Sequence, residues 1–173
     1  MFLKFFKNFS AKRILNKSSL HINTEFSNKP IQKLGLLVDE TFFAEKDKVV
    51  QLLISNGIET KNITVLAFKN KYKRKETVPY PHYSKEDVSW LGTIENKEAL
   101  DFIAQEFDLL ISFYDQKQIP LVIVTHQSKA DFKVGFAEVD KRLNHFMINT
   151  AMENYTIFVE ELFKYLRILN KIK

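Results

Sequence analysis

The sequence contains no cysteine, and this absence excludes several kinds of chemistry together. Without a thiol the chain forms no disulfide, offers no thiolate nucleophile and binds no metal through sulfur. The absence also agrees with a reducing compartment, so we expect a cytoplasmic protein.

Glycine is almost as scarce, because 173 residues include only Gly35, Gly57, Gly92 and Gly135. These four lie far apart. The P-loop and the dinucleotide-binding fingerprint both need closely spaced glycines, where backbone amides approach a phosphate. We therefore expect no cofactor.

Long apolar runs are missing too. No stretch of about 18 apolar residues occurs, so we expect no membrane-spanning helix. A secretory signal needs about 7–15 uninterrupted apolar residues. Lysines interrupt the apolar residues at the N-terminus, which reads MFLKFFKNF. We therefore expect no secretory signal.

Acidic residues are absent from residues 1–24, which hold five basic ones, so the rest of the chain is formally neutral. This segment also has helical amphipathic spacing, because its apolar face repeats at i, i+3, i+4 and i+7. That face consists of Phe2, Phe5, Phe6 and Phe9, and Lys4 and Lys7 fall outside it. The pattern fits a helix that docks on the protein's own core, an anchor on anionic lipid, or a contact with a partner through residues 1–17. We expect the first, with peripheral attachment to the inner face of the membrane as the open alternative.

The rest of the chain alternates short apolar runs with amphipathic stretches. Continuous apolar runs are typical of strands buried on both faces of a parallel sheet. We expect such strands at 33–40, 62–69, 107–115 and 132–136, and a short last one near 144–149. Helices are expected at 43–58, 96–106 and 153–172, and two prolines make 70–83 a loop without a central strand.

Residues 119–130 are ambiguous, because their β-branched side chains favour a strand. A parallel connection between the runs at 109–113 and 132–136 nevertheless needs a crossover of about a dozen residues, usually helical. Pro120 fits the first turn of such a helix. The sequence therefore predicts an α/β fold, a three-layer sandwich around a mostly parallel, Rossmann-like sheet. Residues 1–30 would form a basic helix and linker, and 31–173 a single domain.

In open α/β sheets, ligands bind at the carboxyl ends of the strands. Polar residues follow the expected strands at these ends, a pattern that many unrelated proteins share. Those candidates are Asp39, Glu40, Asp115, Lys141, Arg142 and His145. The two aspartates could act as a general acid and a general base. The alternative is that they have no catalytic role and only mark the points where buried strands reach the solvent. Lys141 and Arg142 could bind a phosphate, or belong to an ordinary charged loop.

Other sites are weakly indicated. The four histidines form neither HExxH nor a close pair, so we expect no metal. A serine hydrolase would need a G-x-S-x-G elbow, which is absent. The basic run at 69–76 includes a tyrosine, but the neutral body favours a solvated loop, and we do not expect nucleic-acid binding.

Several segments resemble an uncharacterised family of short bacterial proteins, a domain of unknown function. They read GLLVDE, FDLLISFYD, SKADFKVGF, DKRLNHFMI and ENYTIFVEELFKYL. Residues 107–169 also resemble, more faintly, the N-terminal half-domain of heptosyltransferase-like glycosyltransferases of the GT-B type. That second resemblance implies a half-domain without the partner that holds the sugar nucleotide.

The missing catalytic motifs favour a binding or interaction protein over an enzyme. The alternative is a small ligand-binding protein or enzyme that uses a crevice at the carboxyl ends of the strands. The sequence names neither a ligand nor a partner.

Overall fold

A computed structural model describes residues 27, 29–73 and 76–172. Its centre is one sheet of six strands, all parallel, in the order β3-β2-β1-β4-β5-β6. The strands are β1 (Leu34–Asp39), β2 (Ile63–Lys69), β3 (His82–Ser84), β4 (Leu109–Phe113), β5 (Phe132–Phe136) and β6 (Phe146–Ile148). The predicted parallel sheet is confirmed, because Leu36 pairs with both Val65 and Ile111, and Ile111 with Val134.

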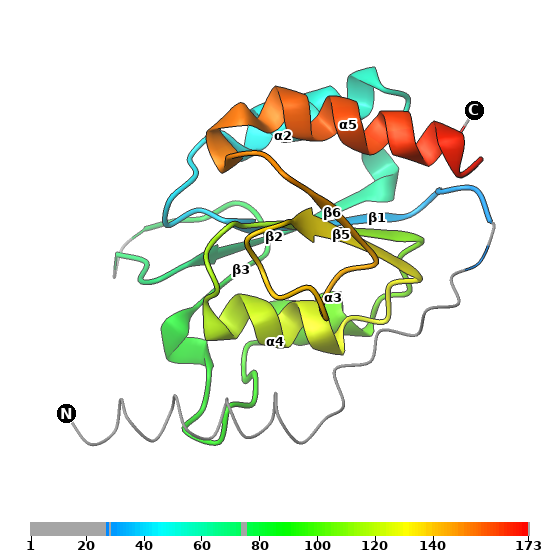
Figure 1. The fold of residues 1–173 in the computed structure, drawn as a ribbon. Coiled ribbons are helices and arrows are strands. Elements are labelled where there is room, and N and C mark those ends of the chain that lie inside the picture. Colours follow the sequence, from blue (N-terminus) through cyan, green and yellow to red (C-terminus); the bar gives the residue numbers. More distant parts are fainter. Residues whose placement is uncertain (1–26, 28, 74–75, 173) are drawn as a thin grey trace.

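Four α-helices cover the two faces of this sheet (Figure 1). They are α2 (Lys46–Ser55), α3 (Lys97–Ala104), α4 (Ile119–Gln127) and α5 (Tyr155–Ile168). Helices α3 and α4 lie on one face, and α2 and α5 on the other. Three 3₁₀ turns, η1 (Thr60–Asn62), η2 (Lys85–Asp87) and η3 (Met152–Asn154), complete the elements described. The three-layer sandwich is therefore confirmed.

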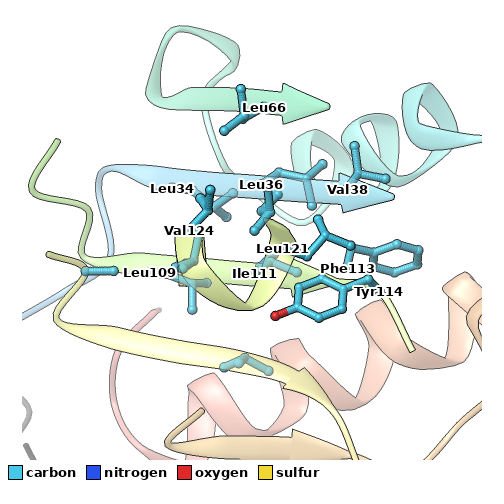
Figure 2. Close-up of a cluster of buried hydrophobic side chains, with 14 of the residues drawn as sticks. Leu34, Leu36, Val38, Leu66, Leu109, Ile111, Phe113, Tyr114, Leu121 and Val124 are labelled. Carbon is cyan, nitrogen blue, oxygen red and sulfur yellow. The ribbon is translucent and has the colours of Figure 1, made fainter. Parts of the chain in front are cut away.

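The core is aromatic-rich, as a chain with 16 phenylalanines predicts. Figure 2 shows buried side chains from β1, β4 and α4 gathered in one cluster. Phe113 belongs to this cluster and also packs against Phe43, Phe136 and Phe158, at ring-centroid distances of 4.9, 5.1 and 5.2 Å. Such tilted and edge-on pairs add stability beyond the area they bury.

One short strand corrects the sequence-based expectation. The segment expected to be all loop ends in β3, which pairs with the last three residues of β2. The prolines still agree with this, because β3 is an edge strand and begins after Pro81. The carbonyl of Pro81 accepts a bond from the amide of Ala67 at 3.0 Å, and Tyr83 is fully buried.

Helix α4 settles the ambiguous stretch in favour of the predicted helix. Pro120 lies in its first turn, where a missing N–H costs nothing. The hydroxyl of Thr125 lies 2.8 Å from that of Tyr114 and 3.2 Å from that of Ser112, so Thr125 faces the sheet.

Gly35 is required in β1 because of a close approach. A Cβ at this position would lie 2.8 Å from the ring of Phe107 and 3.1 Å from that of Phe102. Any larger residue would push Phe102 of α3, and Phe107 after that helix, away from the sheet. Among the residues described, no helix is long and apolar enough to cross a membrane.

Candidate functional site

From β1 the chain first adds strands on one side of the sheet (β2, β3) and then on the other (β4, β5, β6), so the strand order reverses between β1 and β4. Asp39 is the last residue of β1, at this switch point. Its side chain is 1% exposed. One carboxylate oxygen accepts a bond from the amide of Thr41 at 2.9 Å, and the other accepts one from the side-chain amide of Gln118 at 2.6 Å. Asp39 therefore joins the end of β1 to the residue that precedes α4.

The pKa of Asp39 is raised above its ordinary value, mainly because burial disfavours the charged form. The bonds from Thr41 and Gln118 oppose this shift, and the negative charge of Asp115 adds to it. Burial, together with Glu153 and Glu138, also raises the pKa of the half-buried Asp115. The structure thus brings the two predicted aspartates to one edge, which is acidic.

Glu40 lies beside Asp39 in the chain but belongs to a different cluster. Its carboxylate accepts a bond from the hydroxyl of Tyr80 at 2.9 Å and pairs with the ammonium of Lys46 at 3.2 Å. The same ammonium lies 3.7 Å from the ring centroid of Tyr80. Burial lowers the pKa of Lys46, but the bond and charge of Glu40 outweigh it and leave that pKa raised.

Lys141 and Arg142 lie in the loop between β5 and β6. Lys141 is exposed. The guanidinium of Arg142 donates to the carboxylate of Asp140 at 2.7 and 2.9 Å, and Lys117 pairs with the same carboxylate at 3.0 Å. These bonds, chiefly those from Arg142, hold the pKa of Asp140 well below its ordinary value. Asp140 thereby ties this loop to the one that precedes α4.

His145 does not join the other candidates. Its Nδ1 accepts a bond from the amide of Lys133 at 2.9 Å, and its ring stacks on Phe132 with centroids 5.5 Å apart. Both neighbours lie at the start of β5, away from the carboxyl edge. The structure therefore places His145 in the sheet layer and leaves five candidates at the edge.

The buried side-chain amide of Asn144 lies near this edge. Asn144 is 3% exposed, and neither its Nδ2 nor its Oδ1 has a hydrogen-bond partner among the residues that the structure describes. The side chain lies over Gly135, where a Cβ would come within 2.5 Å of Nδ2. The glycine of β5 therefore makes room for a polar group that sequence reasoning did not select.

Within the described part of the chain, no group of three or more histidine or acidic side chains could hold a metal ion. The candidates at Phe2, Phe5, Phe6, Phe9, Lys4 and Lys7 lie outside the described residues. An open hollow of about 450 Å³ lies at the opposite end of the sheet and is lined by charged residues that include Asp108 and Asp131.

A second feature, missed from the sequence, is the loop at 85–95, which carries exposed apolar side chains at its tip. Trp90 is 59% and Leu91 50% exposed. At the base of the loop, Val88 and Ile94 are buried and form an antiparallel bridge. The only available signal was a tryptophan and a leucine before Gly92, between two polar runs.

Many hydrogen bonds brace this loop. Ser84 and Asp87 form a capping box over η2. The amide of Ser89 donates to the carbonyl of Thr93 at 2.9 Å, and their hydroxyls lie 2.6 Å apart. The Ser89 hydroxyl also accepts from the amides of Leu91 and Thr93, both at 3.2 Å. Gly92 adopts a φ of 82°, which favours glycine at the turn.

The parallel order 3-2-1-4-5-6, with helices on both faces, defines a Rossmann-like α/β protein. Residues 7–169 match the model of the Family of unknown function (DUF6913), and the chain belongs to that family. No curated protein and no solved structure matches the chain. The fainter resemblance to glycosyltransferases thus finds no support in these comparisons.

Proposed function

We propose that this chain is a non-enzymatic interaction protein that inserts Trp90 and Leu91 into an apolar pocket of a protein partner. The observation that carries the proposal is the exposure of both side chains at the tip of a braced loop. Tryptophan is enriched among the residues that dominate binding energy at protein interfaces.

Bracing strengthens the argument, because ordering a loop on binding costs free energy. Here Ser89 already fixes the turn through its bonds to Leu91 and Thr93. A loop held in its bound shape loses less conformational entropy when it associates. The hydrogen bonds around Ser89 thus hold Trp90 and Leu91 in an exposed position before a partner binds.

The acidic side chains at the carboxyl edge of the sheet are engaged in bonds within the protein, which supports a structural role for them. Asp39 is bonded to Thr41 and Gln118, and Glu40 is paired with Lys46 and Tyr80. Each carboxylate joins two segments of the chain. These bonds support a role for the acids as ties between loops, so that the edge acts as a support for the fold.

Affinity purification from an extract tests the proposal when four baits are compared. A partner retained by the wild type should be lost with Trp90→Ser and retained with Ile168→Ser, which removes a 64% exposed apolar side chain from α5. Ser89→Ala should weaken the same association, because it loosens the turn and leaves both apolar residues in place. Equal retention by Trp90→Ser and the wild type would contradict the proposal.

Fluorescence then tests direct contact, because Trp90 is the chain's single tryptophan. Adding the purified partner should shift its emission to the blue, since its ring leaves water. A blue shift produced by anionic vesicles, with none produced by the partner, would instead assign the tip to a lipid surface.

A second candidate is a small-ligand site at the carboxyl edge, favoured by the unpartnered amide of Asn144. A buried donor and acceptor without partners is costly, and a bound polar molecule would satisfy both. A thermal-shift screen with sugar phosphates and nucleotides tests this. A ligand that raises the melting temperature of the wild type but not of Asn144→Ala would support it. Equal shifts in both proteins would exclude this residue from the site.

A further inference from the structure

Helix α4 is apolar on every side, although it belongs to an outer layer of the sandwich. Leu121, Val122, Ile123 and Val124 are consecutive, and each is at most 1% exposed. Consecutive residues of an α-helix point about 100° apart, so four of them cover its whole circumference. A helix that is hydrophobic all round is a buried helix.

Ile123 lies on the side of α4 that faces away from the sheet, and its burial there has to be explained. Thr125 faces the sheet, because its hydroxyl bonds with those of Ser112 and Tyr114. Ile123 precedes it by two residues, or about 200° around the helix, and so points away from the sheet. It is nevertheless 1% exposed.

The described elements account for two sides of α4. The sheet lies on one, and α3 is its neighbour in the same layer (Figure 1). Within residues 27, 29–73 and 76–172, no helix or strand lies on the side of α4 that faces away from the sheet. The helices and strands described therefore do not account for the burial of Ile123 on this side.

We propose that residues 2–16 dock on this outer face of α4 through Phe2, Phe5, Phe6 and Phe9. The i, i+3, i+4, i+7 spacing gives the segment one apolar face, which matches an apolar partner surface. Lys4 and Lys7 lie off that face and remain in solvent. The proposal is independent of the function assigned to Trp90.

The path of the chain supports this occupant. Ser27 is tied to Asp131 through its amide at 3.1 Å and its hydroxyl at 2.8 Å. Asp131 follows the last residue of α4, Gln127, by only four positions. The N-terminal segment therefore joins the described fold beside the carboxyl end of α4.

The lengths also agree. Helix α4 has nine residues and spans about 14 Å, whereas a helix of 15 residues spans about 22 Å. The ten residues at 17–26 reach about 33 Å when extended, enough to pass along the whole of α4. The segment can thus lie over Pro120 and Ile123 without strain in the connection.

Photo-cross-linking in the full chain tests the docking. A benzophenone amino acid at position 6 should give an intramolecular cross-link to residues 119–127, identified by mass spectrometry. The same group at position 4, on the opposite side of the predicted helix, should lose that product. Cross-links from position 6 that form only to a second copy, to added anionic vesicles or to other parts of this chain would overturn the proposal.

Hydrogen exchange gives an independent measurement. Phe5→Ser with Phe6→Ser should speed exchange of the α4 amides, because the outer face loses its cover. The matched pair Lys4→Ser with Lys7→Ser should leave their exchange unchanged. Unchanged exchange in both variants, or equal acceleration in both, would overturn the proposal.

Discussion

Helices α4 and α5 cover opposite faces of the same sheet, yet they are built differently. Helix α5 has one buried stripe, which includes Phe158, Leu162 and Leu166, and Ile157 beside it is 49% exposed. Ile123 of α4 points away from the sheet and is 1% exposed. The difference shows that α5 is buried along one stripe, whereas α4 is buried on the side that faces away from the sheet as well, and the docking proposed above would supply the cover on that side.

The largest expected effect is a difference in the free energy of unfolding between alanine variants of these two isoleucines. Ile123→Ala should lower the free energy of unfolding by about 3 kcal/mol, because it leaves a cavity in packed surroundings. Ile157→Ala should change it by less than about 0.5 kcal/mol, as at other exposed positions. Urea denaturation of both variants measures the two values. Equal losses would remove the distinction between the helices.

A smaller effect concerns the hydroxyls that join α4 to the sheet. Thr125→Val should cost about 2 kcal/mol, because the buried hydroxyls of Ser112 and Tyr114 lose their shared partner. Thr156→Val, at an exposed position of α5, is the matched control and should be nearly neutral. Thermal and urea unfolding report both. A neutral Thr125→Val would show that these hydroxyls find other partners.

The smallest effect depends on pH and concerns Lys133, whose ammonium donates to the carbonyl of Thr125 at 2.8 Å near the end of α4. Burial lowers its pKa from 10.5 to about 8. Below this pKa the folded and unfolded chains both carry the proton, and the burial cost is complete. Between about 8 and 10.5 the unfolded chain binds more protons, so stability rises with pH.

Relative to Lys133→Met, the wild type should therefore gain about 1 kcal/mol of unfolding free energy between about pH 7.5 and pH 9. Arg167→Met, in the last turn of α5, should show no such change, because the side chain of Arg167 is exposed. Paired denaturation curves at the two pH values measure the difference. A pH-independent difference for Lys133→Met would contradict the assigned shift.

The layers of the fold followed from the sequence because strands buried on both faces leave continuous apolar runs. The helix at α4 followed from topology, since its β-branched residues alone favour a strand. The strand β3 was missed, because three residues after Pro81 carry no periodicity. The phenylalanine spacing at the N-terminus predicts a helix that docks on the core, but the sequence of α4 does not indicate that its outer face is the partner, since a helix that is apolar all round has no distinct outer face.

The site was only partly predictable for a related reason. Asp39 could be selected as the end of a strand, but its partner Gln118 lies 79 residues away in the sequence. His145 seemed to adjoin the carboxyl edge because it follows Gly135 closely. Since β6 runs parallel to β5, the connecting loop must return to the start of β5, and it carries His145 with it.

Thiol labelling tests the comparison of the two helices most directly, because the chain has no cysteine of its own. Ile157→Cys, on α5, should react at nearly the rate of a free thiol. Ile123→Cys, on α4, should react at least about 100-fold more slowly, since its exposure requires local opening. Equal rates at the two positions would contradict the account of α4 as a covered, inner helix.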